Sequence, residues 1–113
     1  MNMRFGVVGN TSKPVVREVA CSLIDLFRKN KLEFVVHDEL GRWLNGSADR
    51  SIVEATAFCK ASEIGRHADM LIALGGDGTM LAAAHMIGGQ GTPILGINLG
   101  KLGFLAEVSV NEV

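Results

Sequence analysis

The segment Gly75-Gly76-Asp77-Gly78-Thr79 places one carboxylate among glycines, directly after the apolar run Leu71-Ile72-Ala73-Leu74. Glycine has no Cβ and permits positive φ, so the backbone of such a loop can approach a ligand closely. A helix that starts there directs N–H groups and the positive end of its dipole toward an anion. The pattern predicts a phosphate-binding loop in which Asp77 accepts a proton from a hydroxyl or helps to hold Mg²⁺.

A simpler interpretation of the same segment is a tight strand-to-helix turn. Asp77 would then be the N-cap of the following helix, and Thr79 would either cap that helix or contact phosphate. Glycines on both sides of the carboxylate are more than a cap requires. The chain lacks the G-x-x-x-x-G-K-[ST] pattern of P-loop NTPases. Leu81 also occupies the third glycine position of a G-x-G-x-x-G fingerprint, so a hydride-transfer site is weakly supported.

The hydrophobic pattern around this loop predicts alternating strands and helices. The predicted strands are Phe5 to Gly9, Leu32 to Val36, Asp69 to Leu74, Thr92 to Ile97 and Phe104 to Val108, and the predicted helices are Pro14 to Asn30, Ile52 to Arg66 and Thr79 to Ile87. Ser12 is the predicted N-cap of the first helix, with Pro14 just inside it. Residues 38–51 carry charges and glycines and predict a loop or a partly ordered excursion.

This order of elements predicts an α/β fold with a Rossmann-like open, mainly parallel sheet flanked by helices. Ligands of such sheets bind outside the carboxyl ends of the strands. Three polar or glycine-rich loops are expected at that edge: residues 10–13, 75–78 and 98–103.

Composition restricts the classes of function. The chain has 113 residues, a formal net charge of −1 and few aromatic residues, so we expect a single domain that binds neither nucleic acid nor membranes. Its apolar runs are too short for a membrane span, and a strand is predicted near Met1 in place of a signal peptide. The cysteines Cys21 and Cys59 are expected to be reduced, in agreement with a cytoplasmic location. The histidines show no metal-ligand spacing.

A second segment makes the interpretation more specific. Gly75 to Thr79 resembles the GGDGT signature of NAD kinases, of diacylglycerol and sphingosine kinases and, in similar form, of 6-phosphofructokinases. The segment Gly96-Ile97-Asn98-Leu99-Gly100-Lys101-Leu102-Gly103-Phe104-Leu105 closely resembles the G-[IV]-N-x-G-x-L-G-F-L segment of NAD kinases. The two together resemble the N-terminal domain of the NAD kinase (ATP-NAD kinase) family.

The resemblance implies transfer of the γ-phosphoryl group of ATP, or of another phosphoryl donor, to the 2′-hydroxyl of the adenosine ribose of NAD, which gives NADP. It implies that Asp77 is the general base and that Asp77 and Gly78 contact NAD. It places Phe104 against the adenine side of the NAD site and Leu81 in the same pocket. It also implies a divalent ion, Mg²⁺, with the nucleotide, and a homo-oligomer in the full-length protein.

Two departures from the family pattern matter. Ala82 stands where many bacterial members carry an arginine near NAD. The family also has a later Asn-Glu or Asn-Asp motif and a C-terminal all-β domain, and Asn111-Glu112 comes too early to be that motif. Residues 1–113 are therefore predicted to be the N-terminal α/β nucleotide-binding domain, inactive in isolation. The alternatives are a nucleotide-binding module with no activity of its own, or a lipid or sugar kinase of the GGDGT superfamily.

Several further residues are candidates for the site. The predicted cofactor-binding set comprises Gly75, Gly76, Asp77, Gly78, Thr79, Leu81, Asn98 and Phe104, with Asn10, Lys13 and Lys101 as additional candidates. A lysine at such a loop pairs with phosphate or is simply solvated. Trp43 either anchors the excursion at residues 38–51 or contacts another domain.

Overall fold

The computed structural model describes residues 3–46, 52–99 and 107–111. Its strands are β1 (Arg4–Gly9), β2 (Glu33–His37), β3 (Phe58–Cys59), β4 (Met70–Gly75), β5 (Ile94–Asn98) and β6 (Glu107–Asn111). Its helices are α1 (Pro14–Lys29), α2 (Asp38–Gly46), α3 (Ala61–His67) and α4 (Asp77–Ile87), with 3₁₀ turns η1 (Ala55–Ala57) and η2 (Gly88–Gln90).

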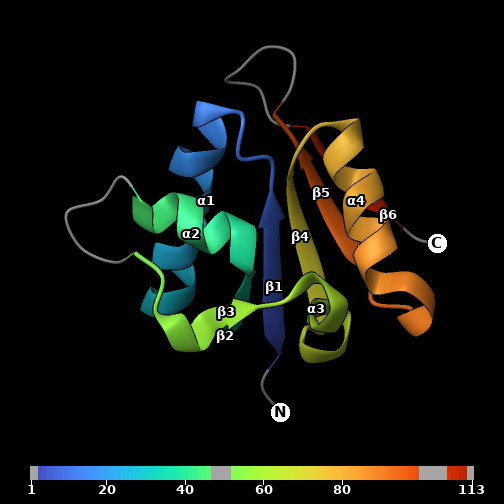
Figure 1. Ribbon diagram of the computed structural model, residues 1–113, viewed down its shortest axis with the longest axis horizontal. Helices are drawn as coiled ribbons and strands as arrows, with labels where there is room; N and C mark the ends of the chain where they lie inside the picture. The colour runs from blue at the N-terminus through green and yellow to red at the C-terminus, as the bar shows by residue number, and fades with distance from the viewer. Residues whose placement is uncertain (1–2, 47–51, 100–106, 112–113) are drawn as a thin grey trace.

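The strands form one sheet in the order β3-β2-β1-β4-β5-β6 (Figure 1). The pairs β2–β3, β1–β2, β1–β4 and β4–β5 are parallel, and β6 pairs with β5 in the antiparallel direction. The predicted α/β fold with a mainly parallel sheet is confirmed. The strand order changes direction at β1, which lies between β2 and β4, and this switch point is where open α/β sheets bind ligands.

Helices cover both faces of this sheet because adjacent strand residues point to opposite sides. On one face, Val7 and Ile72 join a core with Val16, Ala20 and Ile24 of α1. On the other face, a second core is formed by strand residues Val8, Leu71 and Ala73 together with helix residues Ile64, Ala83 and Ile87. Burying each large aliphatic side chain contributes about 1.5–3 kcal/mol, so these two cores hold the strand ends in a fixed arrangement.

Helix α1 begins as predicted at Pro14, but its N-cap is Lys13, without a side-chain capping bond. The prediction that Ser12 caps this helix is wrong. The Ser12 amide and hydroxyl both donate to Asn10 Oδ1, at 2.9 and 2.6 Å, so they stabilise the turn that precedes the helix.

The predicted loop over residues 38–51 is also wrong over its first part, which is helix α2. This helix buries Leu40 and Leu44, which lie four residues apart on one face. Gly41 packs against the ring of Phe58, where a Cβ would lie 2.6 Å from Cε1. The Arg17 guanidinium stacks 4.2 Å from the centroid of Trp43 and donates to its carbonyl at 3.0 Å, so Trp43 anchors α2 to α1.

The single helix predicted over residues 52–66 is replaced by η1, β3 and α3, so within that range only residues 61–66 are α-helical. The Asn45 side chain explains the start of this segment, because Oδ1 accepts from the amides of Ile52 and Val53 at 2.8 and 2.9 Å. The chain then runs extended and pairs with β2 at Val36 and His37.

Two further findings concern the class of protein. Cys21 and Cys59 are free, as predicted, and burial raises the pKa of both thiols. Within the described residues, no helix combines the length and the apolar character that crossing a membrane would need.

Candidate functional site

The glycine loop lies at the carboxyl ends of the three central strands. Two backbone hydrogen bonds join it to its neighbours: the Asn10 amide donates to the Leu74 carbonyl at 3.0 Å, and the Leu99 amide donates to the Gly75 carbonyl at 2.8 Å. The loop after β1, the glycine loop after β4 and the start of the segment after β5 therefore lie side by side (Figure 1). The sequence predicted that residues 10–13, 75–78 and 98–103 meet at this edge, and residues 100–103 of the third loop lie outside the described residues.

Gly75 is required by the local geometry. Its φ is +156°, a conformation that residues with a Cβ rarely adopt. A Cβ there would overlap Thr79 Oγ1 and lie 3.2 Å from Asn10 Cβ. The absence of a side chain lets the first turn of α4 and the loop after β1 approach the end of β4.

Gly76 and Gly78 differ from Gly75. A Cβ at either position would meet no atom of the described residues within 4 Å. Gly76 is the N-cap of α4, with an ordinary negative φ and no side-chain capping bond. Packing gives no reason for glycine at these positions, so their absent side chains leave space beside the helix terminus that a ligand can occupy.

Asp77 is the first residue of α4 and is exposed. Because Gly76 is the N-cap, the alternative interpretation of Asp77 as N-cap is wrong, and Thr79, two residues further into the helix, does not cap it either. The backbone N–H groups at the start of a helix are left without intrahelical partners. The side chains of Asp77 and Thr79 make no capping hydrogen bond, and both residues lie in the first turn of α4 beside these N–H groups.

A cavity of about 490 Å³ opens beside this loop, within the usual range for small-molecule sites. It brings together the predicted residues Asn10, Lys13, Gly76, Gly78 and Thr79. Its other lining residues are Val8, Gly9, Thr11, His37, Glu39, Ala82 and Met86. The cavity therefore extends from the glycine loop across the end of β1 to the end of β2.

His37 and Glu39 were not predicted to belong to the site. His37 ends β2 and Glu39 lies in the first turn of α2. Burial is the largest influence on His37 and lowers its pKa, as Arg42 also does, whereas Glu39 and Asp38 raise it. Their positions were the available signal, since His37 ends and Glu39 closely follows a strand that lies next to β1. Only the strand order shows that this strand is the neighbour of β1.

The other predicted residues have different outcomes. Asn98 pairs in register with Gly75 and so lies beside the loop. Leu81 does not line this cavity, and 62% of its surface is exposed. Met80 packs on Gly96 of β5, where a Cβ would overlap its sulfur, so α4 lies close to the sheet. Lys101 and Phe104 lie outside the described residues.

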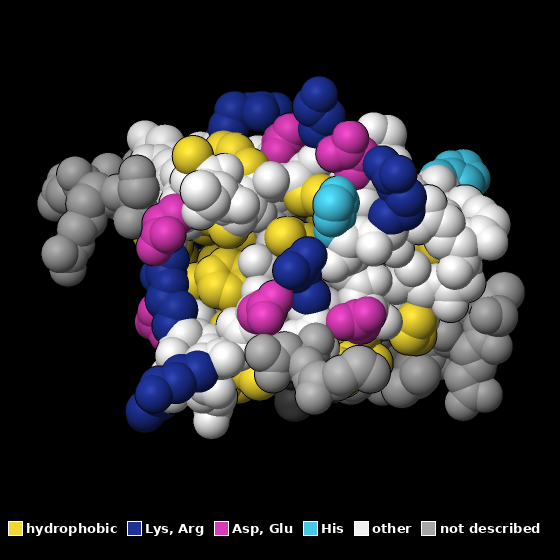
Figure 2. Space-filling view, turned by 90° about the horizontal axis from the view of Figure 1, so that it is seen from below, with side chains coloured by type: hydrophobic (Ala, Val, Ile, Leu, Met, Phe, Trp, Pro, Cys, Tyr) yellow, Lys and Arg dark blue, Asp and Glu magenta, His cyan; other side chains and the backbone are white. Residues whose placement is uncertain are grey.

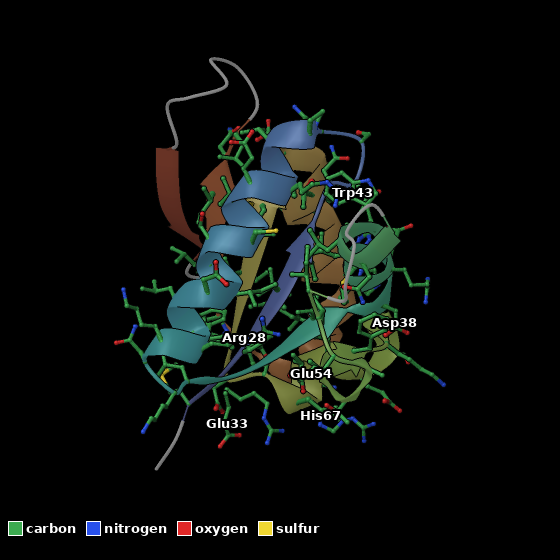
Figure 3. The ribbon with its side chains drawn as sticks, turned by 90° about the vertical axis from the view of Figure 1, so that its left-hand side faces the viewer. Arg28, Glu33, Asp38, Trp43, Glu54 and His67 are labelled. Carbon is green, nitrogen blue, oxygen red and sulfur yellow. The ribbon has the colours of Figure 1, made fainter. Side chains whose placement is uncertain are left out.

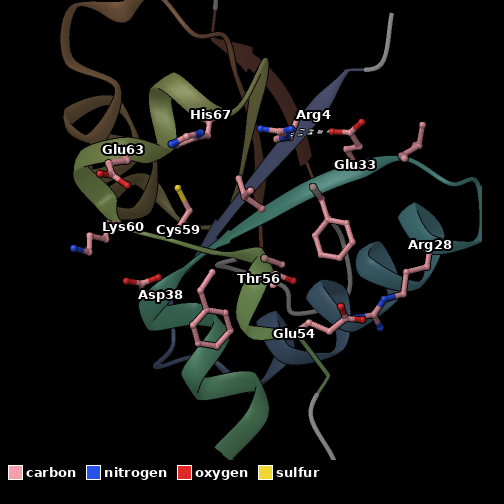
Figure 4. A pocket seen from close by; sticks show the side chains of 15 residues that line it. Arg4, Arg28, Glu33, Asp38, Glu54, Thr56, Cys59, Lys60, Glu63 and His67 are labelled. Atoms are coloured by element: carbon pink, nitrogen blue, oxygen red, sulfur yellow. Dashed lines mark hydrogen bonds and ion pairs between the residues drawn. The ribbon is translucent and has the colours of Figure 1, made fainter.

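A larger hollow of about 720 Å³ runs along β2 and β3, from Glu33 at the start of β2 to Asp38 directly after its end (Figure 2). Arg4 and Glu33, which begin β1 and β2, form an ion pair of 3.0 Å at its edge (Figure 4). Arg28, Glu54 and His67 line the same hollow, away from Trp43 (Figure 3). This hollow has no contact with the glycine loop, so the smaller cavity is the candidate site.

Among the described residues, no group of three or more His, Cys, Asp or Glu side chains is arranged to hold a metal ion. One exposed carboxylate, Asp77, stands beside the glycine loop. A Mg²⁺ ion that enters a protein with substrate phosphates is typically held by one or two carboxylates and keeps several waters, so these residues would suit such an ion.

Comparisons with known proteins show the family of this chain. Residues 5–113 match the family model described as the ATP-NAD kinase N-terminal domain. The chain is 40% identical over 111 residues to an NAD kinase of Bacteroides fragilis, covering 98% of this chain and 37% of that protein. It is 38% identical to an NAD kinase of Moorella thermoacetica, covering 97% of this chain and 32% of that protein. The chain thus spans about a third of the length of these relatives.

A solved structure shares the fold. Yeast NADH kinase complexed with NADH superposes with a TM-score of 0.71 over 92% of this chain and 33% of that chain. The sequence identity in this comparison is 23%. The fold of this chain is therefore shared with that of yeast NADH kinase.

Proposed function

The chain belongs to the ATP-NAD kinase family, and we propose that it forms the nucleotide-binding half of an enzyme that phosphorylates NAD. The reaction transfers the γ-phosphoryl group of ATP to the 2′-hydroxyl of the adenosine ribose of NAD. A bond forms between this ribose oxygen and phosphorus, the bond to the leaving oxygen of ADP breaks, and the hydroxyl proton moves to a base. The products are NADP and ADP.

In this proposal Asp77 is the base. It stands at the N-terminus of α4, exposed and without a capping role, so its carboxylate can accept the hydroxyl proton. The amides that begin α4, around Gly76 and Gly78, bind phosphate oxygens, helped by the helix dipole. Lys13, which lines the same cavity, pairs with the donor phosphates. Mg²⁺ bound to those phosphates supplies further charge neutralisation.

The observation that carries this proposal is the position of the glycine loop at the sheet's switch point. Gly75 lets the loop approach Asn10, and the open positions Gly76 and Gly78 face a cavity shared with Lys13. Asp77 does not line this cavity but stands between Gly76 and Gly78, which do, so a donor phosphate bound at these glycines would lie beside it. Phosphoryl transfer depends chiefly on such positioning and on charge stabilisation.

The NAD side of the site is proposed to lie toward Asn98 and Leu81, together with Phe104 and Lys101. Leu81 leaves an apolar side chain exposed on α4, where a ligand or another domain can cover it. Because the chain spans about a third of its relatives, the remaining wall is proposed to come from a C-terminal all-β domain. We therefore expect residues 1–113 alone to bind nucleotide without making NADP, and we expect the complete enzyme to be a homo-oligomer.

The test is ATP-dependent conversion of NAD to NADP by the complete protein carrying Asp77→Asn. Loss of a general base lowers turnover by about 10²–10⁴-fold. Asp25→Asn, at an exposed position on α1, is the control and should leave turnover unchanged. A change of less than about tenfold for Asp77→Asn would rule out the role as base. NADP synthesis by residues 1–113 alone would rule out the need for another domain.

A further inference from the structure

We propose that Glu39 binds the ribose hydroxyls of the nucleoside triphosphate donor and so makes the site prefer this donor to an inorganic polyphosphate. The inference rests on the proposed function, in which ATP is the donor. It assigns Glu39 as a residue that determines donor specificity.

The cavity has the layout that a nucleotide requires. Strands β4 and β2 lie on either side of β1, so their carboxyl ends are separated by roughly 10 Å. Phosphate-binding positions at Gly76, Gly78 and Thr79 follow β4, and Glu39 follows β2 at the other side of the same cavity. A triphosphate held at the glycine loop would extend past Asn10 toward Glu39 and bring its ribose there.

The charges of the lining residues favour a nucleotide over a polyphosphate. Lys13 is the one lysine or arginine among the described residues that line the cavity, and Glu39 is the one carboxylate. Burial lowers the pKa of His37, so its ring is neutral near pH 7. A polyphosphate carries negative charge along its whole length and would place phosphates against Glu39 with no second lysine or arginine to pair with them.

A ribose has the opposite properties. Its hydroxyls are neutral and donate hydrogen bonds, and hydrogen bonds to a carboxylate are among the stronger ones in proteins. In dinucleotide-binding α/β folds, an acidic side chain after the second strand binds ribose in this way. The cavity also has apolar surface from Val8, Ala82 and Met86. A nucleoside can pack against this surface, whereas a polyphosphate has no apolar group to do so.

Glu39 also has a structural effect, and the test must separate it from binding. An acid in the first turn of a helix interacts favourably with the helix dipole. Asp38 lies in the same turn and shares this effect, but it lines the larger hollow along β2 and not the cavity beside the glycine loop. Asp38→Asn is therefore a matched control for Glu39→Gln, since both remove an acid from the start of α2.

The experiment measures NADP formation by the complete enzyme with ATP, with 2′,3′-dideoxy-ATP and with inorganic polyphosphate. The wild type should use ATP at least tenfold more efficiently than either alternative, since loss of hydrogen bonds to a charged group costs about that factor or more. Glu39→Gln should raise KM for ATP about tenfold and leave KM for dideoxy-ATP unchanged. Asp38→Asn should change neither.

Two outcomes would overturn the inference while leaving the proposed function intact. One is polyphosphate use by the wild type with kcat/KM equal to that of ATP, and the other is an equal effect of Glu39→Gln on ATP and dideoxy-ATP. The comparison of donors on the wild type stands even if the variant does not fold. Absence of NADP with every donor would instead refute the proposed function, and this inference with it.

Discussion

Gly75 and Gly76 are adjacent glycines with different roles, and alanine substitutions should separate them. Gly75→Ala places a Cβ on a residue whose φ is +156° and overlaps Thr79 Oγ1, with Thr79 Cβ at 2.9 Å. Gly76→Ala places a Cβ in open space at a φ of −118°. We expect Gly75→Ala to disrupt the fold and Gly76→Ala to affect mainly the ligand.

The magnitudes follow from these contacts. A residue held at an unfavourable positive φ costs about 1–3 kcal/mol, and overpacking of a tight site costs about 1–3 kcal/mol. Gly75→Ala should therefore lower the free energy of unfolding by about 2–6 kcal/mol. Gly76→Ala replaces a good N-cap residue by a poor one, which costs less than about 1 kcal/mol.

The free energy of unfolding can be measured by urea denaturation followed by far-ultraviolet circular dichroism. Thr79→Ala in the Gly75→Ala background should restore part of the loss, because it removes the overlapping oxygen but leaves the close Cβ. In the complete enzyme, Gly76→Ala should raise KM for ATP, because its methyl group enters the cavity. Loss of less than about 0.5 kcal/mol in Gly75→Ala, or equal losses in both variants, would refute the reasoning.

Two further predictions concern the region beside the site. Burial lowers the pKa of His37 in the folded protein below its value of about 6.5 in the unfolded chain. Between these two pKa values the unfolded chain binds more protons than the folded one. The free energy of unfolding therefore falls as the pH is lowered from the unfolded pKa through the folded pKa. His37→Gln should flatten the dependence of the free energy of unfolding on pH in that window, and an unchanged slope would contradict this. Asn45 accepts hydrogen bonds from the amides of Ile52 and Val53 and donates to the Val53 carbonyl. Asn45→Ala should lower the free energy of unfolding by about 1–3 kcal/mol, whereas Asn45→Asp keeps the acceptor and should lose less; equal urea midpoints for the two variants would count against this account.

The glycine loop and the central strands were predictable because their signals are local. An apolar run that ends in glycines specifies both a strand and its loop, and residues 70–75 form that strand. Helix α2 was not predictable in this way. Its buried residues are Leu40, Gly41 and Leu44, and the fit of Gly41 to Phe58 is a contact between residues distant in sequence. A glycine that favours a loop by propensity is here required by packing.

The error over residues 52–66 has a similar cause. The segment is apolar enough for a helix, but Phe58 and Cys59 pair with the edge of β2, and the Asn45 side chain holds the residues before them. Which segment covers the edge of a sheet depends on strand order, and no local pattern encodes it. The same dependence explains why His37 and Glu39 were missed as site residues, since they join the cavity only because β2 lies next to β1.

The strand order also divides the proposed site into a donor side and an acceptor side. Asp77 begins the helix after β4, and β4 lies between β1 and β5. Lys13 and Glu39 reach the cavity from the β1 and β2 side, whereas Asn98 lies beside Gly75 at the end of β5. If Asp77 acts on a hydroxyl that lies between these two sides, substitutions of Lys13 or Glu39 should change KM for the donor. Substitution of Asn98 should change KM for NAD. In-line transfer of a phosphoryl group from the donor to NAD requires a base between the two ligands, and Asp77, directly after the end of β4, has that position.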